Sequence, residues 1–291
     1  MIEIKNLTKK FPGVIAVNDL SLEIHPGVNG LVGENGAGKS TLLRLISDVI
    51  AKDEGTILID GKDNSDKSIK SNLFFLSDNP YFPNNATEKD VVELYSSLFN
   101  LNVDRFYSIL GKLDLPKNRR LSTFSKGMRR QFFLAITLAM DVDYYLLDEA
   151  FDGLDPVIQE VVKDEIITNS KEKTFLISSH NLLTLEKLCD NFIILSKGRA
   201  TKFGEQIDLG HNFKKYQIIF KDEINKEDLN QIGIKVLSLK KTGSITYLVS
   251  EGENDLELIK EKFNPTLIEN VPIDNEEIIR LEMVINRAKE E

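Results

Sequence analysis

The sequence of 291 residues has a single cysteine, few prolines and no long apolar run. One cysteine, Cys189, excludes an internal disulfide and has no companions at metal-ligand spacing, so we expect it to be structural. The longest apolar run, residues 132–140, is far shorter than the roughly 20 residues that span a bilayer, and it predicts a buried helix. Residues 1–10 alternate apolar and polar side chains and lack the apolar core of a secretion signal. We therefore expect a cytosolic protein.

The chain also lacks a continuous basic surface pattern. Its net charge is -9, and its basic residues are scattered in pairs such as Arg119-Arg120. Such pairs form no stripe that could neutralise a run of phosphates, so we expect no nucleic-acid partner. A composition of 41% hydrophobic and 29% charged residues is typical of a globular protein rather than a disordered one.

The length of the chain predicts two hydrophobic cores. Short apolar runs that alternate with turns and amphipathic stretches indicate an α/β sheet with crossover helices. We expect a first domain over residues 1–205, with a helical insertion over about 80–140, and an accessory domain over 206–291. The strands expected in the first domain are residues 2–4, 20–24, 30–32, 56–59, 73–76, 144–147, 174–177 and 192–195.

The pattern changes at two places along the chain. Within the insertion, Val91, Leu94, Tyr95 and Leu98 recur at helical spacing and share one apolar face. After residue 204 a more polar series begins, and it predicts the order strand, helix, strand, strand, helix, strand. This order resembles a small α+β ferredoxin-like unit. Its expected strands are residues 216–220, 234–239, 245–249 and 266–269, with helices at 256–263 and 275–289.

A phosphate-binding motif is complete in residues 33–41, which read GENGAGKST between an apolar strand and an amphipathic helix. Its glycines let backbone N–H groups point at phosphates, and the following helix adds its positive end. Lys39 would reach the outer phosphates of a nucleotide, and Ser40 would bind magnesium through its hydroxyl. A glycine-rich turn that matches by chance is the competing interpretation. The expected nucleotide contacts are Gly33, Glu34, Asn35, Gly36, Ala37, Gly38, Lys39, Ser40 and Thr41.

Two carboxylates, Asp148 and Glu149, follow the apolar strand at residues 144–147. Open parallel sheets place ligands at the carboxyl ends of their strands. Asp148 would hold magnesium directly or through water, and Glu149 would polarise the attacking water. An acidic pair after a strand can also be a solvated turn, but the phosphate-binding motif about 100 residues earlier favours catalysis.

Residues 124–131 read FSKGMRRQ, and this segment resembles the signature motif of ABC ATPases in its SKGM form. Together with the motifs above, it identifies the P-loop NTPase fold of that family, with a mixed sheet and a helical insertion. In the family this segment begins a helix that contacts the terminal phosphate of a nucleotide held by the opposite subunit. The resemblance implies that role for Ser125 and Gly127. Without the family, Ser125 is a helix N-cap beside an anion-binding helix end.

The resemblance extends over residues 1 to about 205 and implies three further contacts. Asp155, in the segment Gly153-Leu154-Asp155, resembles the aspartate that reaches the other subunit's site, although it could simply begin a helix. His180, in ISSHN, resembles the histidine that contacts the terminal phosphate, although a lone histidine is more often a satisfied polar residue. Phe11 resembles the aromatic residue that stacks on adenine, with a core phenylalanine as the alternative.

The sequence departs from the family pattern at two positions. Family members usually carry glutamine after the strand at residues 73–76, where it links magnesium and water to the membrane subunit. Asp78 occupies this place and could accept from a metal-bound water, unless Asn79 takes the position. The residue after the catalytic glutamate is commonly proline but is Ala150 here, which removes no reactive group.

The resemblance implies an ATP-hydrolysing subunit of an ABC transporter that uses Mg²⁺. It would work with a second ATPase subunit, identical or different, and an integral membrane permease at the inner face of the cell membrane, and would power export of a peptide, antibiotic or lipid. Two alternatives stay open. One is a soluble ABC ATPase with a regulatory or mechanical role and no permease. The other is a nucleotide-regulated binding module without useful turnover.

Overall fold

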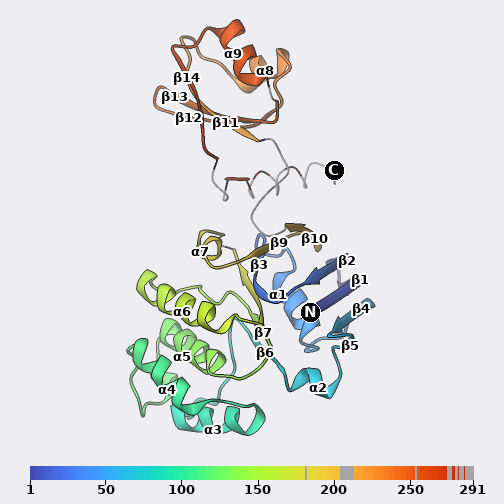
Figure 1. Ribbon diagram of the computed structural model, residues 1–291, viewed down its shortest axis with the longest axis vertical. Helices are drawn as coiled ribbons and strands as arrows, with labels where there is room; N and C mark the ends of the chain where they lie inside the picture. The colour runs from blue at the N-terminus through green and yellow to red at the C-terminus, as the bar shows by residue number, and fades with distance from the viewer. Residues whose placement is uncertain are drawn as a thin grey trace. The chain divides into compact units, whose positions relative to one another are not determined.

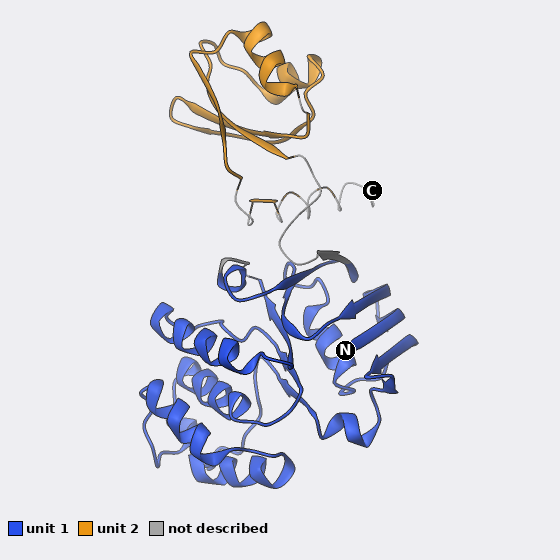
Figure 2. Ribbon diagram, viewed as in Figure 1, with its two compact units in different colours: residues 1–206 blue, residues 207–291 orange. Residues whose placement is uncertain are grey.

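The computed structural model describes residues 1–180, 182–203, 213–252, 254–273, 277, 278, 281 and 285. The chain divides into two compact units, Met1–Gln206 and Ile207–Glu291 (Figure 2). The first unit has two sheets and the second has one, and each unit has its own hydrophobic core.

The centre of the first unit is a six-stranded mixed sheet. Its strands are β3 (Gly27–Val32), β6 (Leu73–Leu76), β7 (Tyr144–Leu147), β8 (Thr174–Ser179), β9 (Asn191–Ser196) and β10 (Arg199–Phe203). The order is β10-β9-β3-β8-β7-β6, with all pairs parallel except β10 with β9 (Figure 1). Strands β7 and β8 are wholly buried, which explains their continuous apolar sequences. Because β3, β7 and β8 run parallel, their carboxyl ends meet at one edge of the sheet.

A second, antiparallel sheet packs against the first. It contains β1 (Ile2–Phe11), β2 (Val14–Ile24), β4 (Glu54–Ile59) and β5 (Lys62–Asp63) in the order β2-β1-β4-β5. Strand β1 is much longer than the predicted residues 2–4. The predicted strand was too short because the alternation of apolar residues is interrupted near Asn6. There φ is +48° and the pairing register shifts.

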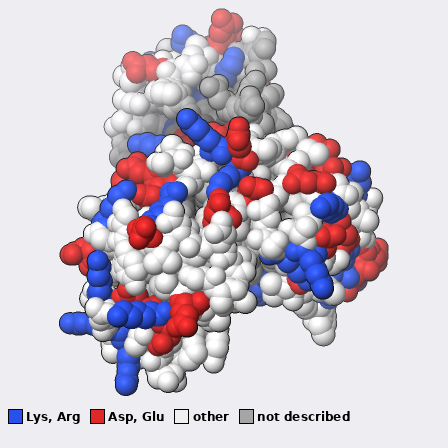
Figure 3. Space-filling model, turned by 60° about the horizontal axis from the view of Figure 1, so that its bottom comes forward, with Lys and Arg blue, Asp and Glu red and all other residues white. Residues whose placement is uncertain are grey.

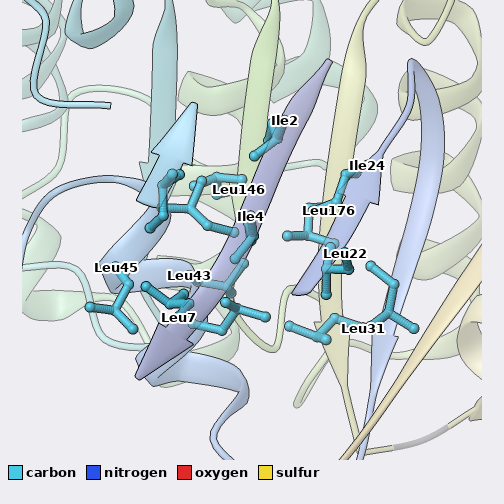
Figure 4. Packing of buried hydrophobic residues seen from close by; sticks show 14 of the residues in the cluster. Ile2, Ile4, Leu7, Leu22, Ile24, Leu31, Leu43, Leu45, Leu146 and Leu176 are labelled. Atoms are coloured by element: carbon cyan, nitrogen blue, oxygen red, sulfur yellow. The ribbon is translucent and has the colours of Figure 1, made fainter. Parts of the chain in front are cut away.

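Helix α1 (Lys39–Ile46) contributes to the core between the two sheets. Figure 4 shows side chains of β1 and β2 facing those of β7 and β8, with Leu43 and Leu45 of α1 among them. Both leucines are almost completely buried. Because its apolar face is enclosed in this way, the N-terminal end of α1 is held in a fixed place beside the strand ends.

Three helices form the predicted insertion: α3 (Glu88–Leu98), α4 (Val103–Lys112) and α5 (Lys126–Leu138). Each begins at a capping side chain that accepts a hydrogen bond from the first turn, supplied by Thr87, Asn102 and Ser125 respectively. Helix α5 includes most of the apolar run 132–140 and is buried there, as predicted. Within the described residues, no helix combines the length and the apolar character needed to span a membrane.

The apolar face expected on α3 is only partly covered. Val91 is buried, whereas Leu94 is 50% exposed and Leu98 is 63% exposed. The other helical segments of this unit are α2 (Lys67–Lys70), the 3-10 turn Leu121–Thr123, α6 (Pro156–Asn169) and α7 (Leu182–Glu186). On the face shown in Figure 3, basic and acidic side chains are interspersed with uncharged surface. The absence of a nucleic-acid partner stays a prediction.

The second unit contains a four-stranded antiparallel sheet in the order β12-β13-β11-β14. Its elements are β11 (Lys214–Ile219), α8 (Lys226–Gln231), β12 (Val236–Thr242), β13 (Ile245–Ser250), α9 (Asp255–Phe263) and β14 (Leu267–Val271). Side chains of the sheet and of α8 and α9 share one core. The succession of elements is the predicted one, and its ferredoxin-like character stays a prediction. The helix expected over residues 275–289 lies largely outside the described residues.

Candidate nucleotide site

Residues 33–41 form the phosphate loop, which follows β3 and includes the first three residues of α1. The loop can curl tightly because of two glycines. A Cβ atom on Gly33 would lie 2.4 Å from the carbonyl oxygen of Leu195, and one on Gly38 would lie 2.2 Å from that of Ala16. Gly38 also has a φ of +106°, which residues with side chains rarely adopt. Larger residues at either position would push the loop away from the sheet.

The remaining loop residues form an exposed tip and a buried base. Glu34, Asn35 and Gly36 are exposed, whereas Ala37 is buried and Thr41 is half-buried. The loop is closed by a hydrogen bond from the main-chain N of Ala37 to the carbonyl oxygen of Glu34, at 3.1 Å. The tip is therefore accessible to a ligand, and the base is part of the core.

Lys39 lies at the first position of α1 and is 5% exposed. Its Nζ donates to the carbonyl oxygens of Gly33 at 2.7 Å and Glu34 at 3.3 Å. The same nitrogen lies 3.4 Å from Oε1 of Glu149. The ammonium group is thus held inside the curl of the loop, between the loop and the catalytic carboxylate predicted from the sequence.

The buried carboxylate of Asp148 meets hydroxyl groups from two other segments. Its Oδ1 accepts hydrogen bonds from Oγ of Ser40 at 3.0 Å and from Oγ of Ser178 at 2.7 Å. Its Oδ2 is buried and has no hydrogen-bond partner among the described residues. An unpartnered buried carboxylate oxygen beside a hydroxyl fits a hard cation such as Mg²⁺. In the described ranges, no group of three or more His, Cys, Asp or Glu side chains could hold a metal.

Glu149 and His180 come together at the ends of neighbouring strands. Nδ1 of His180 lies 2.9 Å from Oε2 of Glu149, and the main-chain N of His180 donates to the same oxygen at 3.2 Å. Glu149 has a φ of +48°, a left-handed conformation that is unusual for a residue with a side chain. Its main-chain N donates to Oγ of Ser178 at 2.8 Å, which helps to hold this conformation.

The predicted signature segment exposes the N-terminal end of α5. Oγ of Ser125 accepts from the main-chain N of Met128 at 3.1 Å, so Ser125 is the N-cap, and its side chain is exposed. A Cβ atom on Gly127 would lie 3.3 Å from the carbonyl oxygen of Gly153, which brings this helix end beside the loop that contains Asp155. Free N–H groups at an exposed helix end favour an anion.

Two further predicted contacts lie in exposed positions. Asp155 is the N-cap of α6, where its Oδ1 accepts from the main-chain N of Ile158 at 3.0 Å. Phe11, at the end of β1, is 44% exposed and has Nζ of Lys9 5.5 Å from its ring centroid. Phe11 is therefore not the core residue that was the alternative interpretation, and an exposed ring is free to stack on a planar ligand.

Asp78 does not join the other two expected magnesium ligands. Its carboxylate is 52% exposed, and Oδ1 lies 3.9 Å from Nη2 of Arg44 in α1. Within the part of the chain that the structure describes, the Asp78 carboxylate makes no hydrogen bond or ion pair with Ser40 or Asp148. Asn79 is also exposed.

Sequence reasoning missed two residues of this site, Ser178 and Arg130. Ser178 lies in β8, two residues before His180, and its place at the end of an apolar run could have indicated a role.

Arg130 is 5% exposed, and its guanidinium donates to main-chain carbonyl oxygens of three residues. Burial lowers the pKa of Arg130, and the carboxylates of Asp152, Asp78, Asp148 and Glu149 act in the opposite direction. A side chain that binds carbonyl groups leaves no motif in the sequence.

Comparisons with known proteins agree with this geometry. A family model described as "ABC transporter" matches residues 17–152. The ABC transporter ATP-binding protein YtrB of Bacillus subtilis is 27% identical over 96% of this chain and 96% of its own length, so the similarity extends into the second unit. NatA, another ABC transporter ATP-binding protein of Bacillus subtilis, is 32% identical over 69% of this chain and 87% of its own.

A third relative and two solved structures extend the comparison. The lantibiotic transport ATP-binding protein SrtF of Streptococcus pyogenes is 30% identical over 68% of this chain and 88% of its own. A solved ATP-binding subunit of an ABC transporter has 25% identity and a TM-score of 0.63, over 70% of this chain and 90% of that one. The dimeric structure of a bacterial ABC transporter cassette has 22% identity and a TM-score of 0.63, over 71% of this chain and 99% of that one. At this identity the similarity shows that the two chains share a fold.

Proposed function

This chain belongs to the ABC transporter ATPases as an ATP-binding and ATP-hydrolysing subunit, and we propose that it powers export of a peptide, antibiotic or lipid through a separate permease. The ATP-hydrolysing role that the proposal requires is supported by one observation: Lys39, Glu149 and His180 meet at the carboxyl edge of the sheet. The similarity to a lantibiotic transport protein supports a peptide among these substrate classes. The subunit would lie in the cytoplasm, attached to the inner face of the membrane through the permease.

The phosphate loop and α1 would hold the nucleotide. Main-chain N–H groups of residues 33–41 would surround the phosphates, and Lys39 would turn from the loop carbonyls to the outer phosphates. Ser40 and Asp148 would hold Mg²⁺, which supplies charge neutralisation on the phosphate oxygens when bound. Phe11 would stack on the adenine ring.

Glu149 would act on the attacking water. Phosphoryl transfer depends mainly on positioning and on stabilisation of the charge that develops on the transferred group. Glu149 would accept a hydrogen bond from the water, and His180 would fix the carboxylate and contact the terminal phosphate. The hydrogen bond from the amide of Glu149 to Ser178 keeps the carboxylate in its place at the strand end.

A second copy, or a similar subunit, would complete the site. The exposed N-terminal end of α5, with Ser125 and Gly127, would cover the terminal phosphate of nucleotide bound to the opposite subunit. Asp155 follows Gly153, which lies beside this helix end, by two residues and would contact the partner's site. ATP would then join two subunits, and its hydrolysis would let them separate.

The partly exposed face of α3 supports a membrane partner. Leu94 and Leu98 leave apolar surface uncovered on the insertion. A helix of the permease could bury this surface and so follow the opening and closing of the dimer. The segment around Asp78 would belong to the same contact.

The first test is the Glu149→Gln variant of the full chain. Removing the carboxylate while keeping its shape is expected to lower ATP turnover by about 100-fold or more, a loss of at least about 2.7 kcal/mol of transition-state stabilisation. ATP binding should remain, so size-exclusion chromatography with ATP should show a stable dimer. Unchanged turnover would refute the assignment of Glu149.

The second test is copurification of the tagged chain from detergent-solubilised membranes of the cells that naturally make it. We expect an integral membrane protein to copurify, and the Leu94→Ser/Leu98→Ser variant to lose it. Ile167→Ser, at a comparably exposed apolar position on α6, is the matched control. Recovery of ribosomes or DNA in place of a membrane protein would favour the soluble alternative.

A further inference from the structure

Arg130 joins three segments that are far apart in the sequence. From the second turn of α5, its Nη1 donates to the carbonyl oxygens of Asp148 at 3.0 Å and Glu149 at 2.9 Å. Its Nη2 donates to the carbonyl oxygen of Asp78 at 2.8 Å. One buried guanidinium therefore links the signature helix, the catalytic strand end and the segment that follows β6.

The contact with Glu149 acts on a strained residue. Glu149 has a φ of +48°, and its peptide groups are held from two sides, with N bound to Ser178 and O bound to Arg130. Strained backbone persists only where its surroundings hold it in place. Loss of either hydrogen bond would let the main chain relax, and the carboxylate would move away from Lys39 and His180.

The contact between Arg130 and Asp78 uses the main chain of Asp78, and the side chain of Asp78 lies near another arginine. The carboxylate of Asp78 lies toward Arg44 of α1, and the carbonyl oxygen lies toward Arg130 of α5. Among the described residues, the side chain of Asp78 makes no hydrogen bond or ion pair with Ser40, Asp148 or Glu149. A displacement of the Asp78 segment therefore reaches the catalytic strand end by two routes. One is the guanidinium of Arg130, and the other is the β6–β7 pairing, which includes the hydrogen bond from the main-chain N of Asp148 to the carbonyl oxygen of Leu76 at 2.9 Å.

We propose that Arg130 is a positioning residue that couples the main chain at Asp78 to the geometry of Glu149. Because Ser125 caps the same helix about five residues earlier, roughly 7 Å along its axis, the end that faces a partner's nucleotide moves together with this link. One side chain thus links three structural elements. The proposal concerns ATP hydrolysis by this chain and does not depend on the transported substrate.

A guanidinium is needed for this geometry. Its planar fork offers five N–H donors in fixed directions, so it can bind several carbonyl groups at once. A lysine in its place has a single nitrogen on a flexible stem, which keeps the charge but cannot hold the same carbonyls in the same directions. Arg130→Lys therefore separates the fork geometry from the charge, whereas Arg130→Met removes both.

The kinetic test compares these two variants with Arg119→Met, which removes an exposed positive charge from the insertion. We expect kcat to fall about 10- to 100-fold in Arg130→Met and less in Arg130→Lys, with KM for ATP within about threefold. Arg119→Met should change kcat less than twofold. An unchanged kcat in folded Arg130→Lys and Arg130→Met, or an equal loss of kcat and nucleotide affinity, would overturn the proposal.

Hydrogen exchange measured by mass spectrometry provides a readout that a general packing role would not give. In Arg130→Lys we expect faster exchange in peptides covering residues 77–82 and 148–154, while the buried part of α5 at 132–138 keeps its protection. If Arg130→Met does not fold, the exchange and kcat of Arg130→Lys alone test the coupling. Faster exchange throughout α5, or no change in 77–82, would contradict the coupling.

Discussion

Ser178 and Asp148 are joined by a short hydrogen bond, with Oγ of Ser178 donating to Oδ1 of Asp148 at 2.7 Å. The same hydroxyl oxygen accepts from the main-chain N of Glu149 at 2.8 Å. One buried side chain therefore orients the expected magnesium ligand and holds the strained residue that would activate water. Loss of an outer group of this kind typically lowers metal affinity or activity about 10- to 100-fold.

We expect Ser178→Ala to lower kcat by about tenfold and to reduce the free energy of unfolding by about 1–2 kcal/mol, because the amide of Glu149 loses its buried partner. Steady-state ATPase assays and urea unfolding measure the two effects. Ser97→Ala, which removes an exposed helix serine that donates to the carbonyl oxygen of Leu94, is the control. A wild-type kcat in Ser178→Ala would contradict the positioning role.

Ser125 should have two separable effects, on helix stability and on the dimer. Ser125→Ala and Asn102→Ala each remove an N-cap and should each cost about 1 kcal/mol in unfolding free energy. In a Glu149→Gln background, Ser125→Ala should also weaken the ATP-dependent dimer by roughly 10- to 100-fold, because a hydrogen bond to a charged phosphate is lost. Analytical ultracentrifugation with ATP measures the dimer. If both cap variants weaken it equally, Ser125 does not face a partner's nucleotide.

Leu43 lies in the core between the two sheets of the first unit and is fully buried. Leu43→Ala should lower the free energy of unfolding by about 2–5 kcal/mol, since it removes buried methyl groups and leaves a cavity. Ile167→Ala, at an exposed position of α6, should change it by less than about 0.5 kcal/mol. Urea titration of both variants checks the difference, and similar losses would mean that the core is not where the structure places it.

Cys189 should react slowly with thiol reagents. Burial, and to a lesser extent the nearby carboxylate of Asp190, raises the pKa of the Cys189 thiol well above its usual range. The thiolate is the reactive form, and a raised pKa makes it scarcer at pH 8. Alkylation by iodoacetamide at pH 8 should therefore be about tenfold or more slower in the folded chain than in urea. Equal rates would mean that the thiol is accessible and readily ionised.

The comparison between sequence and structure is clearest in the phosphate loop and in Asp78. Residues 33–41 and the strand at 144–147 lie where the sequence predicted, because their function depends on contiguous residues and a local turn. The fold class is confirmed by the mixed sheet and by the family match. Asp78 was expected at the metal, but its carboxylate lies near Arg44. Nothing in the local sequence indicated that an arginine of α1 would be within reach.

The sequence alone determined the chemistry of this protein: a lysine in a glycine loop, two carboxylates after a strand, a histidine after the next, and a capped signature helix. Each of these is encoded by neighbouring residues, so each leaves a readable pattern. The tertiary structure decided how they are held. Ser178 lies 30 residues from Asp148, and Arg130 lies 52 residues from Asp78. Their partners include main-chain groups, which every residue carries, so only folding brings the right ones together.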